Sequence, residues 1–132
     1  MKLKIKVCGM KEPNNIVEVA NLNPDYMGFI FYEKSPRFVG KEFAIPTIGK
    51  DIKRVGVFVN HDYDYILLQA GKYHLSYVQL HGGEPTQLCN QLKSEGLGVI
   101  KVFSVDKAFD FGSTKSFQTC VDYFLFDTKG DG

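Results

Sequence analysis

The chain has 132 residues, 44% of them hydrophobic, which is enough for one domain with a substantial core. Its 16 Lys and Arg side chains nearly balance 15 Asp and Glu, and no basic run is interleaved with aromatic residues, so the sequence argues against nucleic acid as a partner. No stretch approaches the roughly 18 apolar residues of a membrane span, and the N-terminus lacks the long apolar segment of a signal peptide, so no membrane partner is expected.

Six short apolar runs follow one another along the chain and predict six strands. Each run is rich in Val, Ile, Phe or Tyr and is short enough to be a strand. The runs lie at 3–7, 26–31, 55–59, 77–81, 99–103 and 123–127.

Apolar residues at helical spacing between these runs predict three helices. The first helix follows Pro13, and the second follows Asn60, which suits an N-cap. The third begins near Pro85 and ends by Gly96. The apolar stripes are Ile16, Val19 and Ala20 in the first helix, Tyr63, Ile66, Leu67 and Ala70 in the second, and Leu88 and Leu92 in the third.

Strands that alternate with helices indicate repeated βαβ units and a parallel sheet. We therefore extend the helical prediction to the less regular connections around 41–50 and 107–118. A (β/α)₈ barrel needs at least about 200 residues, whereas this chain has room for six strands. Two architectures stay open: a smaller open α/β sheet, or a single partial barrel domain in which residues 1–132 supply strands one to six.

Polar residues gather where the predicted strands end, which is where parallel α/β folds place their functional side chains. These residues are Cys8, Gln79, His81, Lys101 and Asp127, with Ser35-Pro36-Arg37 just beyond the second strand. Side chains alternate along a strand, so three inward-facing groups are expected. The groups are Lys4, Lys6 and Cys8, then Gln79 and His81, then Leu125 and Asp127. We expect a thiol, a histidine and a carboxylate to converge at one end of the sheet.

Each of these residues also has an ordinary explanation. A strand cysteine is commonly a buried filler, Asp127 could cap a turn, His81 could be a loop residue, and Arg37 could be a solvated turn residue. The irregular spacing of the three cysteines argues against a disulfide framework or a zinc site and favours a reducing cytoplasm. Of these cysteines, Cys89 lies on the leucine side of a helix and Cys120 precedes a strand, so both are interpreted as structural.

The strand-end motifs carry a resemblance. They read KVCGM at the first strand, FYEKSPRFV after the second, VGVFVN at the third, VQLHGGE at the fourth, KVF at the fifth and FLFDTKG at the sixth. In this order, and over essentially the whole chain, they resemble the phosphoribosylanthranilate isomerase family of tryptophan biosynthesis.

The resemblance implies a (β/α)₈ barrel, often called a TIM barrel, that performs an Amadori rearrangement with no cofactor or metal. The small-molecule substrate phosphoribosylanthranilate, an aminoaldose, becomes a carboxyphenylamino-deoxyribulose phosphate. By resemblance, Cys8 matches the general base and Asp127 the general acid. Arg37 matches the arginine that meets the anthranilate carboxylate, and His81 matches a histidine that lines the pocket.

Two further inward-facing residues are expected to contact the substrate. They are Gln79 and Lys6, and Lys6 is also a candidate for the positive neighbour that would favour a Cys8 thiolate. The family's phosphate-binding loops lie beyond Gly132, with the Gly-Asp-Gly at 130–132 as a candidate start of the first. Residues 1–132 alone are therefore expected to form a curved sheet with an open side and to be essentially inactive.

Two other functions compete with this interpretation. One is a different sugar-phosphate isomerase or epimerase on the same barrel, which would have no need of Arg37 for an aromatic carboxylate. The other is a non-catalytic α/β binding module, for which a buried and unperturbed thiol would be evidence. The sequence is compatible with a monomer or a homodimer.

Overall fold

The computed structural model describes residues 3–128, which form one six-stranded parallel sheet in the order β1-β2-β3-β4-β5-β6. The strands are β1 (Lys6–Val7), β2 (Tyr26–Ile30), β3 (Lys53–Phe58), β4 (Tyr77–Leu80), β5 (Gly98–Val105) and β6 (Tyr123–Thr128). The prediction of six parallel strands is confirmed. The Gly-Asp-Gly at 130–132, predicted to begin a phosphate-binding loop, lies outside the described residues.

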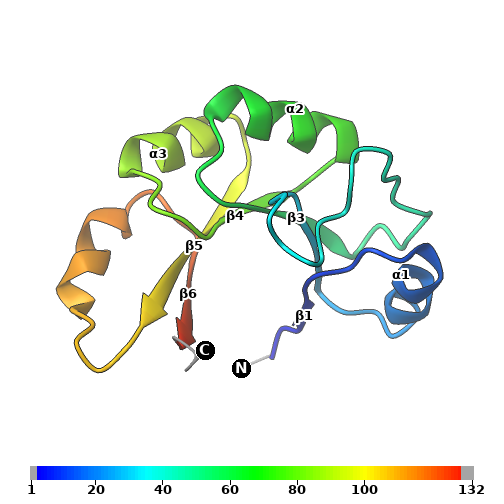
Figure 1. Cartoon of the computed structure of the whole chain (residues 1–132), viewed down its shortest axis with the longest axis horizontal. Helices are drawn as coiled ribbons and strands as arrows, with labels where there is room; N and C mark the ends of the chain where they lie inside the picture. The colour runs from blue at the N-terminus through cyan, green and yellow to red at the C-terminus, as the bar shows by residue number, and fades with distance from the viewer. Residues whose placement is uncertain (1–2, 129–132) are drawn as a thin grey trace.

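The sheet is arched, and its helices lie on the convex side (Figure 1). They are α1 (Pro13–Ala20), α2 (Tyr63–Tyr73), α3 (Thr86–Ser94) and the 3₁₀ helix η1 (Phe111–Phe117). The chain before β1 and the start of β6 approach each other on the concave side, where the Lys4 ammonium donates to the Tyr123 hydroxyl at 3.3 Å. The described residues thus form a half-barrel, as expected for a partial (β/α)₈ fold.

Most of the hydrophobic core lies between the sheet and its outer helices. Ile16 of α1, Ile66 of α2 and Leu92 of α3 are fully buried there, together with Phe29 and Phe58 of the sheet. Burying one such side chain is worth about 1.5–3 kcal/mol. A second, smaller cluster of Tyr26, Val55 and Ile100 lies apart from this core, and its members belong to the alternate set of strand positions, which face the concave side.

The predicted helices differ from the structure in two places. Residues 41–50 contain no helix, so that prediction is wrong. Pro46 cannot donate a helical hydrogen bond, and Phe43, Ile45 and Ile48 contact the core at a spacing that no single helical face provides. The connection around 107–118 contains the 3₁₀ helix η1 rather than an α-helix.

The start of α2 also differs in its cap. Its N-cap is Asp62, whose side chain accepts a hydrogen bond from the Tyr65 N–H at 2.8 Å. Asn60, the predicted cap, instead adopts a left-handed backbone conformation with a φ of 57°. The Asn60 side-chain oxygen accepts a hydrogen bond from the Gly83 N–H in the loop after β4, rather than capping α2.

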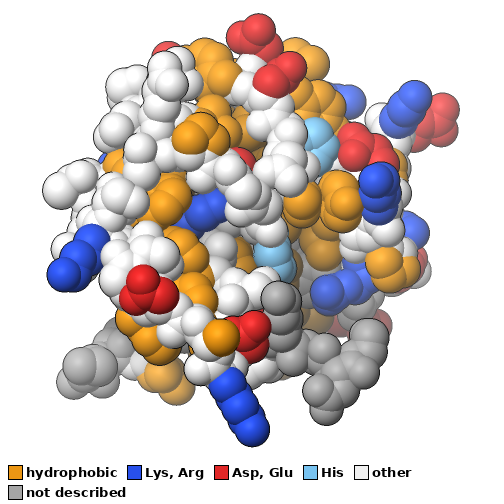
Figure 2. Space-filling view, turned by 60° about the vertical axis from the view of Figure 1, so that its left-hand side comes forward, with side chains coloured by type: hydrophobic (Ala, Val, Ile, Leu, Met, Phe, Trp, Pro, Cys, Tyr) orange, Lys and Arg blue, Asp and Glu red, His pale blue; other side chains and the backbone are white. Residues whose placement is uncertain are grey.

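The surface carries charges of both signs. On the face shown in Figure 2, basic and acidic side chains are interspersed, with hydrophobic side chains between them. In the part of the chain that the structure describes, no helix has the length and apolar character needed to cross a membrane.

Candidate active site

Four of the predicted site residues line one cavity at the carboxyl end of the sheet. The cavity has a volume of about 340 Å³. Its lining consists of Cys8, Ile30, Tyr32, Ser35, Arg37, Val57, Val59, Gln79 and His81. The inward-facing residues of β1 and β4, chosen from strand alternation, are therefore brought together with the arginine of the loop after β2.

Cys8 is a free, partly exposed thiol just past the end of β1. The chain continues beside β2 at this point, because the Met10 N–H donates to the Gly28 carbonyl at 3.0 Å. A Cβ atom on Gly28 would lie 2.8 Å from the Cys8 sulfur. Glycine at position 28 therefore leaves the space that the thiol occupies.

Arg37 reaches the cavity from a tight turn after β2. The Ser35 hydroxyl accepts a hydrogen bond from the Arg37 N–H at 3.1 Å, and the Val39 N–H returns to the Ile30 carbonyl at 3.0 Å. The guanidinium lies against Gly9, where a side chain would collide with it. It makes no hydrogen bond to any of residues 3–128, so its donors are available to an anion.

Gln79 has an unsatisfied acceptor. Only 4% of this residue is exposed, and its side-chain oxygen Oε1 has no hydrogen-bond partner within residues 3–128. Leaving a buried acceptor unpaired costs about 1–3 kcal/mol. The oxygen belongs to a side chain that lines the cavity, so a donor on a bound molecule would relieve that cost.

His81 links the cavity to Asp127. Its backbone N–H donates to the Phe58 carbonyl at 2.9 Å, and its Nε2 lies 3.7 Å from Asp127 Oδ2. The side chains are 36% and 53% exposed, respectively, so both can contact a ligand. Asp127 is not in the cavity lining itself, but it faces the same histidine from β6.

Lys6 lies elsewhere on the inner face. It lines a separate cavity of about 200 Å³ with Lys4, Tyr26 and Tyr123, toward the amino end of the sheet. The structure does not bring it into the Cys8 cavity, and its predicted contact with substrate stays a prediction. Within residues 3–128, no group of three His, Cys, Asp or Glu side chains is arranged to hold a metal ion.

The other two cysteines are structural, as predicted. Cys89 and Cys120 are 0% and 1% exposed and belong to the main core. Burial, together with the neighbouring Cys120 thiol, raises the pKa of Cys89 to about 12. Cys89 therefore stays a neutral thiol at physiological pH.

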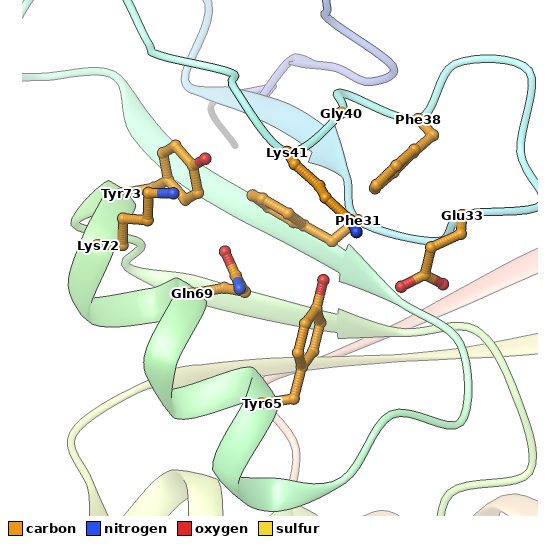
Figure 3. Close-up of a pocket in the computed structure, with 9 residues that line it drawn as sticks. All are labelled: Phe31, Glu33, Phe38, Gly40, Lys41, Tyr65, Gln69, Lys72 and Tyr73. Carbon is orange, nitrogen blue, oxygen red and sulfur yellow. The ribbon is translucent and has the colours of Figure 1, made fainter.

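Another cavity, of about 250 Å³, opens on the outer side of the sheet. Figure 3 shows side chains of α2, among them Tyr65 and Tyr73, facing those of the segment 31–41 across it. This cavity adjoins the coil at 41–50, because Tyr73, which lines it, donates its hydroxyl hydrogen to the Phe43 carbonyl at 2.9 Å. None of the predicted site residues lines it, and we interpret it as a packing gap beside the coil.

Sequence reasoning missed one polar group beside the site. Glu84 and Lys101 form a buried ion pair, with 2.9 Å between Oε1 and Nζ. Burial alone would raise the pKa of Glu84, but hydrogen bonds from the Asn60 N–H and from Lys101 hold it below its ordinary value. The HGGE motif held a signal for this, because adjacent glycines often mark a close approach of other atoms.

The sequence matches known proteins along nearly its whole length. The family model described as N-(5'phosphoribosyl)anthranilate (PRA) isomerase matches residues 5–132. A relative from Parabacteroides distasonis, named N-(5'-phosphoribosyl)anthranilate isomerase, is 45% identical over 97% of this chain and 60% of its own length. A relative of the same name from Phocaeicola vulgatus is 44% identical over 97% of this chain and 62% of its own length.

Solved structures show the same likeness. The phosphoribosyl anthranilate isomerase of Thermotoga maritima aligns with a TM-score of 0.82 at 32% identity, over 98% of this chain and 63% of that one. Another phosphoribosyl anthranilate isomerase, solved with reduced 1-(o-carboxyphenylamino)-1-deoxyribulose 5-phosphate, aligns with a TM-score of 0.70 at 25% identity, over 98% of this chain and 77% of that one. This chain thus spans about 60% of the length of its curated relatives, and it belongs to the phosphoribosylanthranilate isomerase family.

Proposed function

We propose that the protein containing this chain is a phosphoribosylanthranilate isomerase, in which Cys8 is the general base and Asp127 the general acid. The observation that carries the proposal is the shared cavity of Cys8, Arg37, Gln79 and His81 at the carboxyl end of the sheet. Family membership supplies the reaction. The three cysteines are free thiols, which supports the reducing cytoplasm as its location.

The reaction needs one acid and one base on a bound sugar. Asp127 gives a proton to the ribose ring oxygen as the bond from that oxygen to C1′ breaks, which leaves a Schiff base. The Cys8 thiolate then removes the C2′ proton. The electron pair of the C2′–H bond forms the C1′–C2′ double bond of an enolamine, and the electrons of the C1′–N double bond move to the nitrogen. Tautomerisation of the enolamine gives the ketone. Each positioned group contributes about 10² to 10⁴ to the rate.

Arg37 and Gln79 bind rather than transfer protons. The guanidinium of Arg37, whose donors have no partner within residues 3–128, holds the anthranilate carboxylate through two parallel hydrogen bonds. Oε1 of Gln79, which has no partner in the described part of the chain, accepts from an N–H or O–H of the substrate. This use of Arg37 favours an aromatic carboxylate over the substrates of other sugar-phosphate isomerases.

The proposal is tested by supplying the complete gene product with phosphoribosylanthranilate and following the aminoketose by chromatography. Conversion that disappears in Cys8→Ser supports it. Conversion of aminoaldose phosphates lacking the carboxylate at the same rate would favour another sugar-phosphate isomerase. A parallel assay of residues 1–132, with and without a fragment that supplies the remaining strands, tests the expectation that this part alone is inactive.

A further inference from the structure

Glu84 and Lys101 line a neighbouring cavity of about 480 Å³, which shares His81 with the Cys8 cavity. Both residues are almost completely buried, with 4% and 3% of each exposed. Such a pair is weak evidence for stability, because replacing it by neutral side chains of similar size is often harmless. Its contacts point to a different role.

The two oxygens of Glu84 connect two loops. Oε1 accepts from the Gly82 N–H at 2.8 Å, and Oε2 accepts from the Asn60 N–H at 2.8 Å. Lys101 completes the connection by donating to the Gly82 carbonyl at 2.7 Å. The Asn60 side chain in turn accepts from the Gly83 N–H at 2.8 Å. The backbone N–H and carbonyl of Gly82 are thus both bound, and a carboxylate is required because both of its oxygens are used.

This connection lies directly beside His81. The backbone is held on both sides of the His81 side chain. The His81 N–H donates to the Phe58 carbonyl, and the next residue, Gly82, is bound by Glu84. A Cβ atom on Gly82 would lie 2.5 Å from the Asn60 oxygen, so Gly82 packs directly against the Asn60 side chain. The imidazole consequently remains 3.7 Å from the Asp127 carboxylate.

We propose that Glu84, neutralised by Lys101, is a positioning residue that fixes His81 beside Asp127 in the active site. This inference rests on the proposed function, in which Asp127 is the acid. Without Glu84, the loop moves, and His81 no longer orients the carboxyl group that must reach the ring oxygen. The alternative is that the ion pair only stabilises the fold.

A double substitution separates the two roles. In Glu84→Gln/Lys101→Met no unpaired charge is buried, so the protein should fold. The N–H and the Gly82 carbonyl that lose their partners should lower its thermal midpoint only modestly. The amide of Gln has one acceptor oxygen in place of two, so it cannot bind the two N–H groups in the wild-type arrangement, with one on each oxygen. We therefore expect a kcat roughly tenfold lower or more, with little change in KM. Hydrogen exchange should show a Gly82 amide that has lost its protection.

The matched control is Lys93→Met. Lys93 and Asp122 form a second lysine–carboxylate pair at 2.7 Å, and Asp122 likewise accepts a backbone N–H, that of Val99 at 2.8 Å. This control should keep both the kcat and the Gly82 protection of the wild type.

The inference is overturned if the double variant retains wild-type kcat or wild-type protection of Gly82. A wild-type protein without isomerase activity would instead reject the proposed function. In that case the exchange measurement still decides whether Glu84 holds the loop.

Discussion

Both ends of the sheet carry polar side chains on the concave side, but those side chains are used differently. At the amino end, Tyr26, Tyr77 and Tyr123 begin the even strands β2, β4 and β6. Their rings contact one another edge-on or tilted, with centroids 5.3 to 6.2 Å apart. The Tyr26 and Tyr123 hydroxyls are 3.1 Å apart, and Lys4 donates to Tyr123. The interior of a (β/α)₈ barrel is filled in this way, because each layer of side chains comes from alternate strands.

At the carboxyl end the polar groups have few partners among residues 3–128. Arg37 has no hydrogen-bonded anion, the Gln79 oxygen has no donor, and His81 meets Asp127 only at 3.7 Å. Satisfied polar groups stabilise a fold, whereas unsatisfied ones facing a cavity are suited to a ligand. Under the proposed function, the amino end packs the fold and the carboxyl end carries the chemistry, and substitutions at each end can test this division.

The largest expected effect is that of Cys8→Ser. A hydroxyl is a far poorer base than a thiolate at neutral pH, so kcat should fall by about 10² or more while the fold is retained. Steady-state kinetics of the complete gene product, with circular dichroism as a check on folding, measure this. Near-normal turnover in the variant would remove Cys8 from the mechanism.

Asp127→Asn should come next. The amide keeps the shape of the carboxyl group but cannot donate the proton that opens the ribose ring, so kcat should fall by about 10². Single-turnover rates separate this loss from product release. Retained activity would mean that the carboxylate is a turn-capping group.

Arg37→Ala should mainly weaken binding. Charged hydrogen bonds contribute about 1.5–3 kcal/mol each, so the loss of both bonds of the bidentate contact should raise the Kd of a product analogue by about 10². Calorimetric titration measures this Kd. The matching test uses an analogue without the carboxylate, which wild type and variant should bind equally; a difference between them would contradict the role.

The smallest effect is expected at the amino end, from Tyr123→Phe. This change removes the hydroxyl that contacts Tyr26 and Lys4, at a cost of about 0.5–1.5 kcal/mol in the free energy of unfolding. Urea denaturation measures that cost. Turnover should be unchanged, and a loss of kcat comparable to that of Cys8→Ser would erase the distinction between the two ends.

Much of this arrangement could be predicted from local sequence. Strand alternation alone placed Cys8, Gln79 and His81 on one face, because side-chain direction repeats every two residues, and the structure confirms that they line one cavity. The helix predicted at 41–50 was wrong because tertiary contacts of its apolar residues outweigh their weak helical pattern. Asp127 was expected to converge with Cys8 and His81. It lies 3.7 Å from His81 but does not line the cavity that holds Cys8.

The parts that were missed depend on contacts between distant segments. Lys101 was noted only as a polar residue near a strand end, yet it faces the outer side and pairs with Glu84. The adjacent glycines of the HGGE motif indicate a close approach at this loop, but nothing local to Glu84 identifies Lys101 as its partner. The tyrosine layer was also missed, although a tyrosine at the first position of three alternate strands was visible in the sequence.

The account is tested most directly by the alkylation of Cys8 in the complete gene product. Iodoacetamide should modify Cys8, which is partly exposed, and spare Cys89 and Cys120, which are buried. Reduced 1-(o-carboxyphenylamino)-1-deoxyribulose 5-phosphate at ten times its Kd should slow this modification by about tenfold, because only the free protein reacts. Mass spectrometry of the peptides gives the rate at each thiol. A Cys8 rate that does not change while the analogue is bound would contradict an active site at the carboxyl end of the sheet.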